Sequence, residues 1–132
     1  MCAVTDDSLL QLMPFAATLG IELDAADASE VRGHLAWSER LCTAGGIMHG
    51  GALMALADSL GGICGHLNLP PGARTATISS GTVFLRAVRD GVVTAVTRPL
   101  HTGRTVIVVQ TDLSDATGRP VAQITQTQAV LS

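Results

Sequence analysis

Aromatic side chains are scarce in this chain of 132 residues: they make up 2% of it, and tyrosine is absent. Because 47% of the residues are hydrophobic, the core has to be built from small aliphatic side chains, which let neighbouring elements approach closely. The length suits one compact domain and leaves no room for a second core. We therefore expect a single domain over residues 1–132.

A run of basic residues is also missing. Eight Lys and Arg residues stand against eleven Asp and Glu residues, which gives a formal net charge of -3. Phosphate backbones and anionic membranes attract clustered positive charge. Nucleic acid and membrane are therefore not expected as partners.

A signal peptide and a membrane-spanning segment are not apparent either. The N-terminal stretch MCAVTDDSLLQLMPF carries acids where a signal peptide has basic residues. The longest apolar stretch is interrupted by Asp58, His66 and several glycines. A cytoplasmic location is the expectation, and the widely spaced Cys2, Cys42 and Cys64 are interpreted as reduced thiols.

Hydrophobic periodicity divides the chain into three parts. In DDSLLQLMPFAATLG, apolar residues at helical spacing end at Gly20, which predicts a short helix bent near Pro14. Residues 21–37 alternate between apolar and polar side chains on both sides of an AADAS turn, which predicts two strands. Four later runs rich in Val, Ile and Thr are separated by RDG, HTGR and DATGRP, which predicts an antiparallel meander.

The middle stretch, GGIMHGGALMALADSLGG from Gly45 to Gly62, predicts a central helix. One aliphatic stripe recurs at steps of three and four: Leu53, Leu56, Leu60, Ile63 and Leu67. A second set with the same steps lies on nearly the opposite side: Gly51, Ala55, Asp58, Gly62 and Gly65. We expect a helix that is packed on all sides, with Asp58 in the tightly packed face of small residues.

Asp58 has two interpretations, because a desolvated carboxylate costs several kcal/mol unless it gains partners. It either has a structural role, as a cap, an arginine partner or a group reaching solvent, or it acts as a catalytic base or nucleophile. At the helix start, Gly50 and Gly51 have no side chains, so an oxyanion could approach both amides. Eight residues, roughly 12 Å of helix, separate Gly50 from Asp58, so one substrate could contact both.

GGIMHGGALMALADSLGG, followed by FLRAV, PLHTGR and Val- and Ile-rich closing strands, resembles the hotdog-fold acyl-CoA thioesterases. The closest likeness is to the branch with phenylacetyl-CoA and hydroxybenzoyl-CoA thioesterases and those of the enterobactin and menaquinone pathways. The resemblance covers almost the whole chain. It implies an α+β fold in which an antiparallel sheet wraps around a long central helix. It also implies a homodimer with a continuous sheet and active sites at its interface, and a homotetramer of two dimers.

The same resemblance assigns roles to residues near the helix start. Asp58 matches the catalytic carboxylate, Gly50 the amide that polarises the thioester carbonyl, and His49 the histidine that positions the thioester. Thr43 stands where Asn or Gln is usual, and Gly62 where some members have Ser or Thr. We therefore expect hydrolysis of an acyl-CoA thioester, and these two departures keep open a non-catalytic module that binds acyl-CoA or acyl carrier protein.

Further positions concern the partner subunit and coenzyme A. Thr77 falls near a position where another branch takes a Ser or Thr from the partner subunit, and Ser79 is expected two residues on along the same face. Arg86 in FLRAV, and Gly103 with Arg104 in LHTGR, match positions near the nucleotide or diphosphate of coenzyme A.

An acyl pocket is expected near Met48, Met54 and the N-terminal helix with Phe15, and Gly51 is placed in the substrate-binding set. Such a pocket suits an aliphatic chain or a ring, and the sequence does not decide between a small, medium-chain or aryl acyl group. No cofactor beyond the coenzyme A of the substrate is expected. A metal site is not expected either, because the Cys64 and His66 pair lacks further ligands at a matching spacing. A dehydratase or hydratase is a weaker third alternative.

Overall fold

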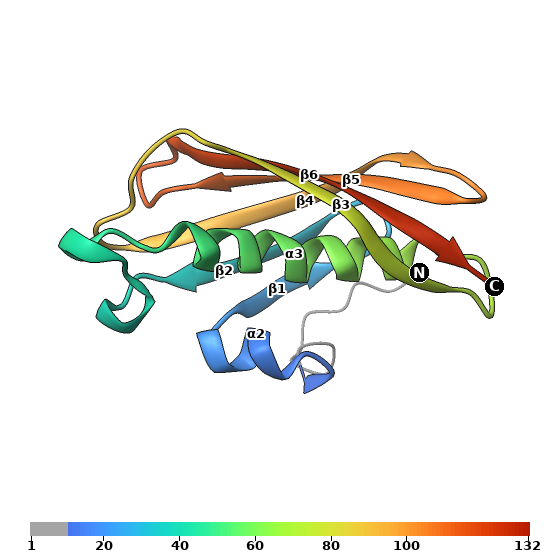
Figure 1. Ribbon diagram of the computed structural model, residues 1–132, viewed down its shortest axis with the longest axis horizontal. Coiled ribbons are helices and arrows are strands. Elements are labelled where there is room, and N and C mark those ends of the chain that lie inside the picture. The colour runs from blue at the N-terminus through green and yellow to red at the C-terminus, as the bar shows by residue number, and fades with distance from the viewer. Residues whose placement is uncertain (1–10) are drawn as a thin grey trace.

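The computed structural model describes residues 11–132 and shows a six-stranded antiparallel sheet wrapped around one long helix (Figure 1). The helices are α2 (Pro14–Leu19) and α3 (Gly50–Leu67). The strands are β1 (Glu22–Ala26), β2 (Val31–Ala36), β3 (Arg74–Phe84), β4 (Val92–Thr102), β5 (Val106–Ser114) and β6 (Pro120–Leu131). Two short 3-10 turns, Glu39–Leu41 and Ala44–Gly46, precede α3. The α+β fold that the resemblance implies is confirmed.

Helix α2 begins at Pro14 and is ended by Gly20. Proline suits the first helical position, because its fixed φ is helical and no acceptor is needed for an amide it lacks. Gly20 has a φ of 88°, the left-handed conformation that commonly ends a helix. The predicted break at Pro14 and stop at Gly20 are confirmed, whereas the earlier part of the predicted helix lies outside the described residues.

The sheet has the strand order β1-β2-β4-β5-β6-β3. Strands β4, β5 and β6 form the predicted meander, but β3 pairs with β6 at the far edge, from Arg74 opposite Leu131 to Phe84 opposite Ala122. The hairpin predicted at RDG between β3 and β4 is therefore wrong. Turn residues specify a local change of direction, whereas the partner of β4 on that side is β2, which pairs with it over six residues.

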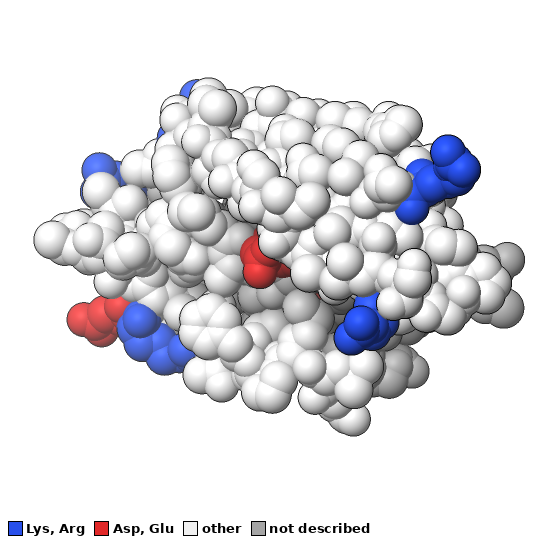
Figure 2. All heavy atoms as spheres, turned by 45° about the vertical axis from the view of Figure 1, so that its right-hand side comes forward, with Lys and Arg blue, Asp and Glu red and all other residues white. Residues whose placement is uncertain are grey.

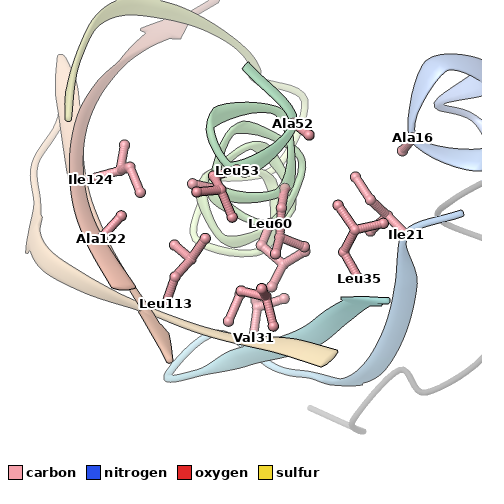
Figure 3. Close-up of a cluster of buried hydrophobic side chains, with 14 of the residues drawn as sticks. Ala16, Ile21, Val31, Leu35, Ala52, Leu53, Leu60, Leu113, Ala122 and Ile124 are labelled. Atoms are coloured by element: carbon pink, nitrogen blue, oxygen red, sulfur yellow. The ribbon is translucent and has the colours of Figure 1, made fainter. Parts of the chain in front are cut away.

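The aliphatic stripe of α3 packs on the inner face of the sheet, as predicted. Figure 3 shows Leu53 and Leu60 of α3 directed toward the sheet that carries Val31 and Leu113. These four side chains are at most 3% exposed. Burying a leucine-sized side chain contributes roughly 1.5 to 3 kcal/mol. Within residues 11–132, no helix has both the length and the apolarity needed to cross a membrane.

The opposite face of α3 is open in the single chain. We call the stripe formed by every fourth residue, Gly50, Met54, Asp58, Gly62 and His66, the open stripe. Its three non-glycine members are exposed, and the two glycines are half-buried. The prediction that α3 is packed on all sides, with Asp58 in a tightly packed face, is therefore wrong for one chain. The curved sheet covers only part of the circumference of the helix.

Candidate active site

The loop before α3 is fixed by hydrogen bonds on two sides. The indole nitrogen of Trp37 donates to the carbonyl oxygen of Gly46 at 3.0 Å. Gly46 has a φ of 74°, which few residues other than glycine adopt without strain. The Met48 amide donates to the carbonyl oxygen of Val88 at 2.8 Å. The first turn of α3 therefore starts from a defined position.

His49 caps α3 from outside the helix. Its Nδ1 atom accepts a hydrogen bond from the Gly51 amide at 2.8 Å. Because Nδ1 acts as an acceptor, the neutral ring carries its proton on Nε2, which is a donor. The Gly51 amide is thus already occupied. Of the two amides expected to receive an oxyanion, only that of Gly50 has no acceptor among residues 11–132.

The Gly50 amide lies at a cleft of about 360 Å³, which Thr43, Met48, Phe84 and Arg86 also line. A Cβ atom added to Gly50 would lie 3.0 Å from the ring of Phe84, so a side chain at this position would require the ring to move by a few tenths of an ångström. The structure therefore brings together four residues predicted from the sequence, Thr43, Met48, Gly50 and Arg86. Phe84 was missed, although it is the first residue of the quoted FLRAV motif.

Asp58 lies on the open stripe two turns beyond Gly50, with Met54 between them. Figure 2 shows a face on which uncharged side chains predominate, with an acidic group recessed near its middle. The Nε2 atom of Gln126 donates to Oδ1 of Asp58 at 2.8 Å. Gln126 is fully buried and is a second residue that sequence reasoning missed. The feature that could have identified Gln126 is a polar residue at an inward-facing position of β6.

The hydroxyl of Thr77 donates to Oε1 of the buried Gln128 at 3.1 Å. A bulge interrupts β3 between Thr77 and Ser79, so Thr77 lies opposite Gln128 and Ser79 lies opposite Thr127. Gln128 faces inward and Thr127 outward, and residues directly opposite each other share a face. The prediction that Ser79 shares the face of Thr77 is therefore wrong.

The arginines expected to hold coenzyme A lie at opposite ends of the molecule. Arg86 donates to the carbonyl oxygen of Pro120 at 3.0 Å and borders a second hollow of about 420 Å³, together with Arg89 and Arg119. Arg104 lies in the turn between β4 and β5, near the Arg74 end of β3. A strand of eleven residues is roughly 33 Å long. A single chain does not bring Arg104 and its neighbour Gly103 to the Gly50 cleft.

Two smaller hollows flank the open stripe. One, of about 250 Å³, is lined by Leu12, Met13, Gly62, Ile63 and His66 and is almost wholly apolar. A Cβ atom added to Gly62 would meet nothing within 4 Å, so this part of the helix surface is open space. The other, of about 200 Å³, is lined by residues that include Phe15, His49 and Gly51.

Thiol chemistry is not favoured by the environment of Cys64. The side chain is fully buried, and this burial raises the pKa of the thiol to about 11. A thiolate is the reactive form of cysteine, so Cys64 has the properties of a structural residue. Among residues 11–132, no three His, Cys, Asp or Glu side chains lie close enough to hold a metal ion.

The family model described as the thioesterase superfamily matches residues 45–122. The chain is 33% identical over 86 residues to the 1,4-dihydroxy-2-naphthoyl-CoA hydrolase of Escherichia coli K12, covering 65% of this chain and 63% of that one. The crystal structure of thioesterase HI1161 from Haemophilus influenzae superposes with a TM-score of 0.91 at 29% identity, covering 98% and 92% of the two chains. A hypothetical thioesterase protein from Streptococcus pneumoniae, solved with coenzyme A, gives a TM-score of 0.84 at 25% identity, covering 95% and 98%.

Proposed function

Because the chain belongs to the thioesterase superfamily and is a thioester hydrolase, we propose that it hydrolyses acyl-CoA thioesters to coenzyme A and a free acid. Asp58 is the catalytic carboxylate, and the Gly50 amide donates to the thioester carbonyl. The observation that carries this proposal is the Gly50 amide without an acceptor, at a cleft beside the open stripe that carries Asp58. Because roughly 12 Å of helix separates the two groups within one chain, the Asp58 that acts on a carbonyl held at Gly50 is that of the second copy.

The chemistry follows from these two groups. The carbonyl oxygen gains negative charge as the tetrahedral intermediate forms, and the Gly50 amide stabilises that charge. In one route, Asp58 takes a proton from water, hydroxide adds to the carbonyl carbon, and the departing thiolate recovers the proton. In the other, Asp58 adds to the carbonyl carbon and expels the thiolate, and water then hydrolyses the mixed anhydride. Neither route needs a cofactor or a metal ion.

His49 and Thr43 complete the thioester end of the site. The Nε2 proton of His49 is available to hydrogen-bond the substrate, since Nδ1 is held by the Gly51 amide. Thr43 lines the Gly50 cleft with a hydroxyl, which offers one donor where an amide side chain would offer two.

The two ends of the substrate fit different hollows. The cleft at Gly50 leads to Arg86, which suits the diphosphate of coenzyme A because a guanidinium binds phosphate oxygens well. The apolar hollow beside Gly62 suits the acyl group, with Met54 between it and Gly50. The similar Streptococcus pneumoniae structure contains coenzyme A, which supports coenzyme A as the thiol part of the substrate. The Escherichia coli relative is named for the hydrolysis of an aryl coenzyme A ester, which is compatible with an aryl acyl group here.

A second copy of the chain completes the site in this proposal. Strand β3 has its outer edge unpaired among residues 11–132 and carries exposed apolar side chains, including Ile78 and Val83. Pairing of two β3 edges gives a homodimer with a continuous sheet, and two dimers give a homotetramer. In the dimer, Gly103 and Arg104 of the second copy approach the Gly50 cleft. A single domain over residues 1–132 and a cytoplasmic location remain parts of the proposal.

A panel of aliphatic and aryl acyl-CoAs tests the function, with release of free coenzyme A thiol as the readout. We expect the Asp58→Asn variant to turn over its best substrate roughly 100-fold or more slowly than the wild type. The Asp112→Asn variant, which changes an exposed carboxylate on β5, is the control and keeps the wild-type rate. Equal turnover by wild type and Asp58→Asn would contradict the proposal.

The same panel tests the second candidate function, a binding module for acyl-CoA or acyl carrier protein. The observation that favours it is Thr43, which lines the cleft without an amide side chain. Tight binding of acyl-CoA without release of thiol from any member of the panel would support this module and overturn the hydrolase.

A further inference from the structure

Two buried glutamines of β6 face two glycines of α3. Gln126 lies against Gly61, and Gln128 lies against Gly65. Both glutamine side chains are at most 1% exposed. Buried amides are costly unless they are hydrogen-bonded, so each needs a partner within the fold. Gln128 accepts hydrogen bonds from the hydroxyls of Thr77 and Thr75 at 3.1 and 3.4 Å, and Gln126 donates to Asp58.

The orientation of the Gln126 amide is fixed by the group it faces. A carboxylate only accepts hydrogen bonds, so the nitrogen of the amide has to point to Asp58. The distance from Nε2 to Oδ1 of Asp58 is 2.8 Å. The other end of the amide, Oε1, is buried and has no hydrogen-bond partner among residues 11–132. Among residues 11–132, the bond to Asp58 is therefore the one hydrogen bond that this buried amide makes.

Gly61 makes room for this arrangement. A Cβ atom at position 61 would lie 1.7 Å from Oε1 of Gln126, so even alanine would displace the amide. Gly61 is within α3, where glycine is less favourable than alanine. The sequence therefore has a helix-weakening residue at a position where a side chain would push Gln126 away from Asp58.

We propose that Gln126 is a positioning residue for Asp58, an inference that rests on the proposed function. By holding Oδ1, the Gln126 amide fixes the rotation of the carboxylate. Oδ2 has no partner among the described residues and stays available to the substrate or to water. The amide reaches Asp58 from the interior of the fold, so it holds the carboxylate without occupying the exposed side from which a substrate enters.

Steady-state kinetics of a small set of variants tests this role with the best acyl-CoA of the panel. Gln126→Met keeps the size of the side chain and removes the donor. We expect kcat to fall roughly 10-fold or more, as for loss of a hydrogen bond to a charged group, with KM within about twofold of the wild type. Gly61→Ala keeps the amide in the chain and displaces it, and we expect the same selective loss of kcat.

Gln110→Met is the matched control, because Gln110 is a half-buried glutamine of β5 whose amide donates to Thr125. It keeps the wild-type kcat and KM. Each variant is compared at equal concentration of folded protein, determined from its thermal transition. A loss of kcat in Gln126→Met and Gly61→Ala but not in Gln110→Met supports the positioning role.

Three results would overturn it and are distinguishable from one another. If Asp58→Asn has lost turnover while Gln126→Met keeps the wild-type kcat, the positioning role fails and the proposed function stands. A change in KM or in thermal stability alone, with kcat intact, likewise leaves Gln126 as a structural residue. If Asp58→Asn itself keeps the wild-type rate, the proposed function fails and takes the role of Gln126 with it.

Discussion

His34 lies between two carboxylates on the outer face of the sheet. Its Nδ1 atom is 2.8 Å from Oδ2 of Asp24, and its Nε2 atom is 2.9 Å from Oε2 of Glu22. The hydrogen bond to Asp24 is the main cause that raises the pKa of His34 above its ordinary value of 6.5, and partial burial opposes it. The protonated ring therefore connects β1 to β2 through two ion pairs.

The raised pKa of His34 gives stability a defined dependence on pH. Because the folded pKa is higher than the unfolded one, the contribution is fully present below about pH 6.5 and is lost as pH rises through the folded value. We expect wild type to exceed His34→Gln in melting temperature at about pH 6, and the gap to shrink toward about pH 9. A gap that grows with pH would contradict this assignment.

Single residues of the site were predictable where their chemistry stands in one continuous stretch. His49, Gly50 and Asp58 follow from the helix start and its spacing, and the structure places them at one end and along one side of α3. Gln126 could not be found in this way, because it is 68 residues from Asp58 in the sequence. A polar side chain at an inward-facing position is recognisable only when the phase of the strand against the helix is known.

The open stripe of α3 is a property of the whole element. The aliphatic face was predictable from the spacing of its leucines, because a helix of this pattern has to bury that face. The exposure of the other face was not predictable, because small residues are compatible with packing inside one chain and also with packing between two chains. The pairing of β3 with β6 was missed for a similar reason: turn residues do not encode which strand becomes the neighbour.

Gly62 provides a test of the acyl hollow at the level of the helix. A Gly62→Leu side chain would project from α3 into the hollow lined by Leu12, Met13 and Ile63. We expect kcat/KM for the longest accepted acyl groups to fall roughly tenfold relative to acetyl-CoA, because the added carbons take the place of the substrate. The measurement is the ratio of kcat/KM values across an acyl-length series.

The control is Ala36→Leu, which adds the same side chain at an exposed position at the end of β2. An unchanged chain-length profile in Gly62→Leu would show that the acyl group lies elsewhere.

The molecule as a whole leaves apolar surface uncovered along β3 and the open stripe. Ile78 is 62% exposed and Val83 59%, on a strand that has a partner on one side only among the described residues. Exposed apolar edge strands are typical of sheets that extend into a second copy. Because the net charge is acidic and basic side chains are few, another protein surface suits this edge better than nucleic acid or an anionic membrane does.

Light scattering coupled to size-exclusion chromatography tests the proposed dimer. At micromolar concentration, we expect a mass of two or four times the 13.5 kDa of one chain. An Ile78→Asp variant introduces a charge that pairing of β3 edges would desolvate, so we expect it to shift toward monomer and to lose activity together. A wild-type monomer with full activity would contradict a site shared between two copies.

In the proposed mechanism, Gly50 and Asp58 act on the same thioester carbonyl. The most direct measurement is a crystal structure of the wild-type protein with an inert acyl-CoA analogue, in which a ketone replaces the thioester. We expect the ketone oxygen about 3 Å from the Gly50 amide nitrogen, with the free oxygen of Asp58 of the second copy facing the carbonyl carbon directly or through one water. A ketone bound away from the Gly50 amide, on the far side of the molecule from Asp58, would contradict it.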